Sequence, residues 1–88
     1  MADITLAELK NMLPAEAIPA LDDYIVRHPE SDEAFTIRGL KHWALDHRAQ
    51  AIKDYHSAIA INPDSDARKA LEIADSILSF YNKDLLNP

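Results

Sequence analysis

The sequence predicts an all-α protein, and three observations lead to this prediction. Apolar residues recur three and four positions apart along most of the chain, as they do on one face of an α-helix. Prolines and capping residues divide the 88 residues into five such pieces. The chain has a single glycine, which nearly excludes an all-β fold or a glycine-rich phosphate loop, since both need glycine at positive φ.

The ends of the five pieces are marked by local signals. Natural N-caps stand before three of them, at Thr5, Ser31 and Ser65. Prolines end or limit them, at Pro14, Pro29 and Pro63. Pro19, inside the second piece, is expected to loosen or kink the first turn of that helix without breaking it. The expected helices cover residues 6–13, 15–27, 32–45, 48–61 and 66–81, with 82–88 as a tail.

Length and composition restrict the function. Eighty-eight residues allow one domain, and 48% hydrophobic residues are normal for a globular chain. The net charge of −6 disfavours nucleic acid and anionic membranes as partners. The lack of cysteine excludes disulfides, thiolate nucleophiles and sulfur-ligated zinc. With no membrane-length apolar run and no targeting segment, we expect a cytoplasmic protein.

The sequence also repeats itself internally. Pro29 and Pro63 lie 34 residues apart, and the residues before them align, Ala17 with Ala51 and Ile25 with Ile59. A 34-residue period of two helices and a proline-marked turn resembles the tetratricopeptide repeat. The family signature is met at Phe35, Gly39, Ala51, Tyr55, Ala58 and Pro63.

Two positions depart from that signature. Arg38 stands in place of the usual leucine, and His42 in place of the usual aromatic residue. The resemblance implies antiparallel helix hairpins stacked in a short right-handed superhelix. Its units are a truncated repeat over 4–31, a full repeat over 32–65 and a terminal capping helix over 66–81. Gly39 itself indicates a close helix contact, because glycine inside a helix costs about 1 kcal/mol relative to alanine.

Catalytic and metal-binding patterns are weak in this sequence. Pairs among the four histidines lack the i, i+4 spacing of helical metal sites, and neighbouring carboxylates point about 100° apart on a helix. No nucleophile elbow is present. We therefore expect no enzyme activity, no cofactor and no metal, although a small regulator that binds metal or ligand through its histidines remains a distant alternative.

The resemblance implies that a protein or peptide binds on the first helix of each hairpin. On the third helix the corresponding face carries Glu33, Thr36, Leu40, Trp43 and Ala44. The Lys/Asn clamp by which some family members hold a C-terminal carboxylate is absent. Two interpretations of the face stay open: it is covered by the first and fifth helices, or it forms a partly open groove or a self-association surface.

The fifth helix suggests an alternative function. Its apolar residues span nearly half of its circumference, whereas a terminal capping helix needs a polar outer face. Either the tail folds back over this surface or another chain covers it. The alternative to peptide binding is therefore a self-associating homodimer through the terminal helix, with the contact residues Ala74, Ile77, Leu78, Phe80 and Tyr81.

Overall fold

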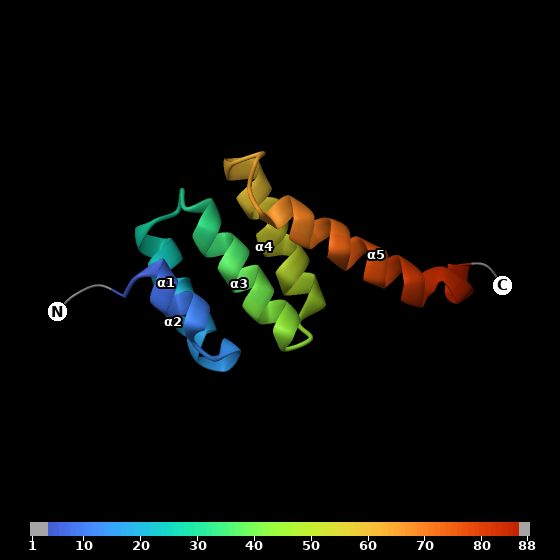
Figure 1. Cartoon of the computed structure of the whole chain (residues 1–88), viewed down its shortest axis with the longest axis horizontal. Coiled ribbons are helices and arrows are strands. Elements are labelled where there is room, and N and C mark those ends of the chain that lie inside the picture. Colours follow the sequence, from blue (N-terminus) through green and yellow to red (C-terminus); the bar gives the residue numbers. More distant parts are fainter. Residues whose placement is uncertain (1–3, 87–88) are drawn as a thin grey trace.

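The computed structural model describes residues 4–86, with side chains up to residue 80. Over this range the regular structure is entirely α-helical, which confirms the all-α part of the prediction (Figure 1). Among the described residues, no helix is both long enough and apolar enough to cross a membrane. The helices are α1 (Leu6–Asn11), α2 (Pro14–Arg27), α3 (Asp32–Ala44), α4 (Arg48–Ile61) and α5 (Ala67–Leu86).

The predicted caps form as hydrogen bonds at the helix starts. Thr5 Oγ1 accepts from the Glu8 amide at 3.2 Å, and Ser31 Oγ accepts from the Ala34 amide at 3.2 Å. Each cap satisfies an amide that has no partner inside its helix. Because these bonds are local, the starts of α1 and α3 follow directly from the sequence.

The turn between α3 and α4 is a Schellman motif built without glycine. Asp46 has φ of +63°, the left-handed conformation that usually selects glycine. The Asp46 amide donates to the Trp43 carbonyl at 3.0 Å, and the His47 amide donates to the His42 carbonyl at 2.8 Å. The chain therefore reverses within three residues, which lays α4 beside α3.

Gly39 is a point of close approach between α3 and α4. A Cβ atom placed there would lie 2.6 Å from Tyr55 Cε1 and 3.2 Å from the Ala51 carbonyl oxygen. Both distances are shorter than ordinary van der Waals contact. The close approach predicted at the only glycine is thus present in the structure, with the buried Tyr55 ring filling the space beside it.

The core consists of two clusters joined at Phe35. The first cluster lies between α1, α2 and α3, and its buried members are Leu9, Ala17, Leu21, Ile25, Ala34 and Ile37. The second lies between α4 and α5, and its buried members are Ala51, Tyr55, Ala58, Ala67 and Ala74. Phe35 packs against both clusters, so one apolar core runs through the stack.

Arg38 links three helices through ion pairs. Its Nε and Nη2 atoms donate to the two carboxylate oxygens of Asp54 on α4, at 2.9 and 2.7 Å. Its Nη1 atom donates to Asp22 on α2 at 2.9 Å, and the guanidinium lies 5.4 Å from the centre of the Phe35 ring. The bonds to Asp54 raise the pKa of Arg38 above its usual value, although burial acts in the opposite direction.

Two sequence expectations are corrected. Residues 82–86 are not a tail, because α5 continues to Leu86; no glycine or proline stands between Tyr81 and Leu86 to stop it. α2 begins one residue earlier than expected, at Pro14. It runs through Pro19 without a break, as the sequence predicts.

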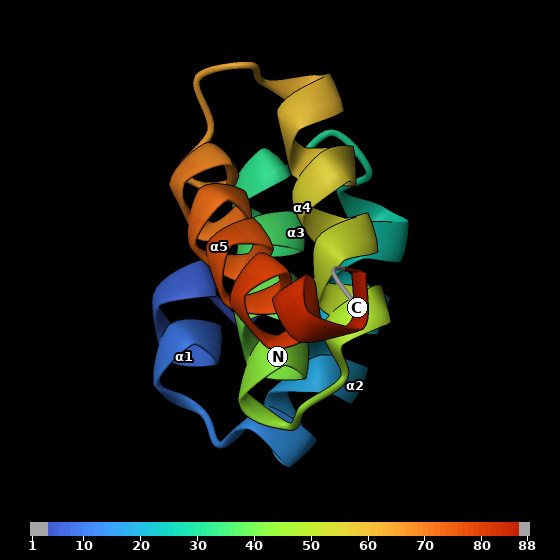
Figure 2. The same cartoon turned by 90° about the vertical axis from the view of Figure 1, so that its right-hand side faces the viewer.

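The molecule is elongated, measuring 57 × 27 × 17 Å. Figure 1 shows that the C-terminal half of α5 extends beyond the stack of the other four helices. In Figure 2, which looks along the longest axis, this half comes toward the viewer. Residues 82–86 therefore continue α5 and do not fold back over it, and one end of that helix lies outside the body of the protein.

Candidate functional site

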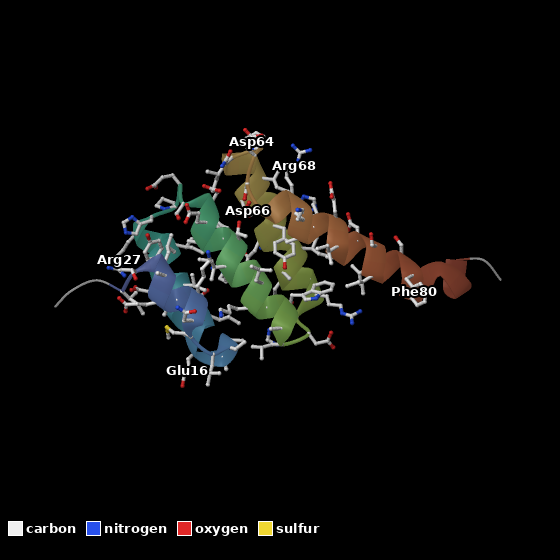
Figure 3. All side chains as sticks on the ribbon, viewed as in Figure 1. Glu16, Arg27, Asp64, Asp66, Arg68 and Phe80 are labelled. Carbon is white, nitrogen blue, oxygen red and sulfur yellow. The ribbon has the colours of Figure 1, made fainter. Side chains whose placement is uncertain are left out.

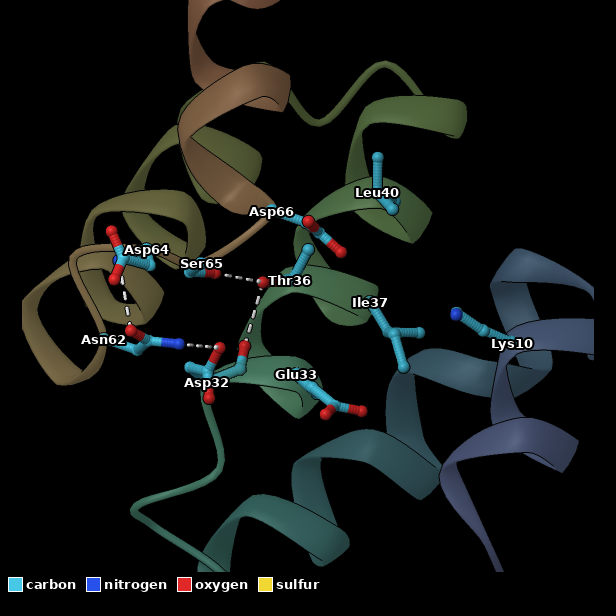
Figure 4. A pocket seen from close by; sticks show the side chains of 10 residues that line it. All are labelled: Lys10, Asp32, Glu33, Thr36, Ile37, Leu40, Asn62, Asp64, Ser65 and Asp66. Carbon is cyan, nitrogen blue, oxygen red and sulfur yellow. Dashed lines mark hydrogen bonds between the residues drawn. The ribbon is translucent and has the colours of Figure 1, made fainter.

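A groove lies between α1, the N-terminal half of α3 and the turn that joins α4 to α5 (Figure 4). It encloses a volume of about 370 Å³. Its apolar surface comes from α3, where Ile37 is buried and Leu40 remains 47% exposed. The complete lining is Lys10, Asp32, Glu33, Thr36, Ile37, Leu40, Asn62, Asp64, Ser65 and Asp66.

A chain of hydrogen bonds fixes one wall of the groove. Thr36 Oγ1 donates to the Asp32 carbonyl at 2.9 Å and lies 3.2 Å from Ser65 Oγ. Because the Thr36 proton is already used, Ser65 must donate to Thr36, and it accepts from the Ala67 amide at 3.1 Å. Both hydroxyl groups are buried and satisfied, so α3 and the start of α5 are held at a fixed separation.

A second set of bonds orders the turn at the rim. Asn62 Nδ2 donates to Asp32 Oδ2 at 3.4 Å, while Asn62 Oδ1 accepts from the Asp64 amide at 3.0 Å. The latter bond is the local Asx-type bond that stabilises tight turns. The turn therefore presents its acidic residues from a defined backbone.

The opposite wall depends on Lys41. Its ammonium donates to the carbonyls of Lys10 and Met12 at 2.7 and 2.8 Å. These carbonyls stand at the C-terminal end of α1, where the helix dipole favours a cation. Lys41 thereby fixes α1 against α3, which positions Lys10 at the groove.

The groove is predominantly acidic. Its lining contains four carboxylates, and Lys10 is the only cation among the lining residues. Figure 4 shows the Asp66 carboxylate and the Lys10 ammonium pointing into the groove from opposite sides. The carboxylates belong to Asp32, Glu33, Asp64 and Asp66. This arrangement favours a ligand that carries positive charge beside an apolar group.

The residues proposed for peptide binding separate into two groups. Glu33, Thr36 and Leu40 line the groove. Trp43 is half-buried against the cluster between α4 and α5, and Ala44 is exposed at the end of α3 outside the groove. Sequence reasoning missed the remaining lining residues, because most of them come from α1 and from the turn before α5.

The residues proposed for self-association also differ in their surroundings. Ala74 is only 2% exposed, because it packs against α4, so it is not available to another chain. Ile77 and Leu78 are half-buried, and Phe80 is 75% exposed and projects from α5 (Figure 3). The side chain of Tyr81 lies outside the described residues.

The histidines form one close pair. His42 Nδ1 and His47 Nδ1 lie 3.2 Å apart, so one ring donates to the other. Burial, the largest cause, lowers the pKa of His42 below its usual value. Within the described part of the chain, no three His, Cys, Asp or Glu side chains form a group that could hold a metal ion.

Comparisons with protein-family models, with curated proteins and with solved structures gave no match for this chain.

Proposed function

We propose that this chain is a non-catalytic protein–protein interaction domain of the tetratricopeptide type, which binds a peptide segment in the groove beside α3. The observation that carries this proposal is the groove itself. It combines a half-exposed leucine, Leu40, with walls held by the hydrogen bonds of Thr36 and Lys41. A fixed, partly apolar depression with a polar rim is the usual form of a small binding site.

The repeat assignment is supported by the packing of its signature positions. Gly39 contacts Tyr55 and Ala51 across the hairpin, which is where the signature places small residues beside an aromatic ring. The departure at Arg38 is compensated, because its guanidinium is paired with the buried carboxylate of Asp54. The aligned prolines and the helix lengths are compatible with the same assignment.

The chemistry of the groove defines the peptide we expect. An apolar side chain on Leu40 and Ile37 would contribute about 1.5–3 kcal/mol if fully buried. A lysine or arginine beside it would lie near the carboxylates of Asp64 and Asp66. We therefore expect short segments that combine a basic residue with a large apolar one, and we expect their binding to weaken as salt is raised.

Selection from a phage-displayed library of random dodecapeptides tests the proposal. We expect enriched sequences of the basic–apolar type, and a synthetic peptide of that sequence should bind in isothermal titration calorimetry. Leu40→Asp should weaken its binding tenfold or more, because it places a charge on the apolar floor. Leu13→Asp is the matched control, since Leu13 is 68% exposed and lies outside the groove.

Three results would refute peptide binding in this groove. They are a library that yields no binder, a peptide that binds Leu40→Asp as tightly as the unmodified protein, and equal losses for Leu40→Asp and Leu13→Asp.

A further inference from the structure

The 34-residue period relates a buried position of α3 to an exposed position of α5. Gly39 faces α4, the second helix of its hairpin. Thirty-four residues later the chain has Ile73, which is 55% exposed. Since α5 follows the α3–α4 hairpin as the next first helix, Ile73 lies on the side where a second helix would pack. No described helix occupies that side.

An apolar seam runs along this side of α5, and we define it as Ile73, Ile77 and Phe80. The spacing of four and then three residues keeps all three on one face of the helix. The seam is distinct from the side that packs on α4, where Ala74 is buried. It is also separate from the peptide groove, whose lining ends at Asp66.

The position of α5 leaves room for another helix along the seam. A helix of 20 residues is about 30 Å long, and only the first part of α5 packs on the second core cluster. The remainder extends beyond the other helices (Figure 1). A partner helix can therefore lie along the seam with its own body at the opposite end.

We propose that the occupant is α5 of a second copy of this chain, packed antiparallel along the seam. Each copy then provides the second helix that the hairpin beginning with α5 lacks. The interface is isologous, with a twofold axis close to Ile77, which is the commonest form of dimer.

The register of the seam favours the antiparallel orientation. Pairing Ile73 with Phe80 of the second copy places Ile77 near the axis. The same register places the Lys69 residues of the two copies at opposite ends of the pair. A parallel pair would instead set Lys69 beside Lys69. Like charges at such flanking positions disfavour the parallel orientation.

The size of the seam indicates a reversible dimer. Phe80 is 75% exposed, so its burial removes roughly 110–190 Å² from water, and Ile73 adds a smaller area. Ile77 is already half-buried, so the three residues of each copy give an interface well below the roughly 1,200 Å² of a standard stable complex. We therefore expect a weak, reversible dimer that forms toward the millimolar end of the concentration range.

Sedimentation equilibrium from micromolar to millimolar concentration tests the dimer. The unmodified protein should approach twice the mass of the chain, and Ile73→Glu should remain at the mass of one chain throughout. Ser79→Glu is the matched control, because it adds the same charge at an exposed position of α5 outside the seam. Circular dichroism should show equal helix content for all three proteins.

If the unmodified protein still has the mass of a single chain at millimolar concentration, the dimer proposal is wrong. If Ile73→Glu still dimerises, or if Ser79→Glu prevents dimerisation as strongly as Ile73→Glu does, the seam is not the dimer interface.

The orientation is tested with single cysteines in a chain that otherwise has none. A disulfide needs its two Cβ atoms about 3.8 Å apart, so only positions near the axis of an antiparallel pair can link to themselves. Ile77→Cys should form a covalent dimer in oxidised glutathione, whereas Lys69→Cys should not. Linking of Lys69→Cys as fast as Ile77→Cys would overturn the antiparallel arrangement.

Discussion

Replacing Arg38 by leucine should destabilise the protein, although leucine is the residue that the repeat signature has at this position. The side chain of Asp54 is 5% exposed, and both of its oxygens accept hydrogen bonds from Arg38. In Arg38→Leu this carboxylate would stay buried without its cation. The chain would then carry an uncompensated charge in its interior.

The size of the effect follows from the burial of the pair. Removing one partner of a buried ion pair costs about 3–5 kcal/mol, and we expect about 3 because the Arg38 side chain is 21% exposed. A domain of this length has a free energy of unfolding of about 4–13 kcal/mol. The loss is therefore a large part of the total, and the melting temperature should fall by about 12–24 °C.

Urea denaturation followed by circular dichroism measures the cost, and a double variant identifies its cause. Arg38→Leu combined with Asp54→Leu removes both charges and should lie within about 1 kcal/mol of the unmodified protein. Asp22→Asn should cost less than about 1 kcal/mol, because that carboxylate is 57% exposed. The reasoning fails if Arg38→Leu costs less than about 1 kcal/mol, or if the double variant is as unstable as Arg38→Leu.

Three further predictions concern stability. Gly39→Ala should cost about 1–3 kcal/mol in urea denaturation through its clash with Tyr55, despite the better helix propensity of alanine, and a more stable variant would contradict the contact. Asp46→Gly should raise the melting temperature, because glycine adopts the left-handed φ of this turn without strain; an unchanged or lower value would count against it. The lowered pKa of His42 means that the unfolded chain binds more protons near pH 6, so stability should fall as the pH drops from about 6.5 through the pKa of folded His42. An NMR titration of the His42 ring with a midpoint at or above about 6.5 would contradict this prediction.

The helices could be predicted because their signals are local. Each cap, at Thr5 and at Ser31, bonds an amide three residues further along the chain. The single glycine indicates a close helix contact, because a side chain at that position would clash with the neighbouring helix. From the sequence we expect the fifth helix to end at Tyr81, whereas α5 continues to Leu86, because no glycine or proline stands between these two residues to stop it.

The ion pairs and most of the groove depend on contacts that sequence spacing does not reveal. Arg38 and Asp54 are 16 residues apart and meet only because α3 and α4 pack at Gly39. One signal was present: Asp54 falls between Ala51 and Ala58 on the buried face of α4, where a carboxylate needs a partner. Lys10 and Asp66 join the groove from separate elements, so no helical pattern could place them there.

Chemical-shift mapping by NMR tests the peptide groove most directly. The ¹⁵N-labelled protein is titrated with the peptide selected from the dodecapeptide library. We predict that the largest amide shifts fall on Glu33, Thr36, Leu40 and the turn at residues 64–66, while Val26 on the outer face of α2 does not move. Shifts centred on α2 or along the α5 seam, with the groove unchanged, would contradict peptide binding at this site.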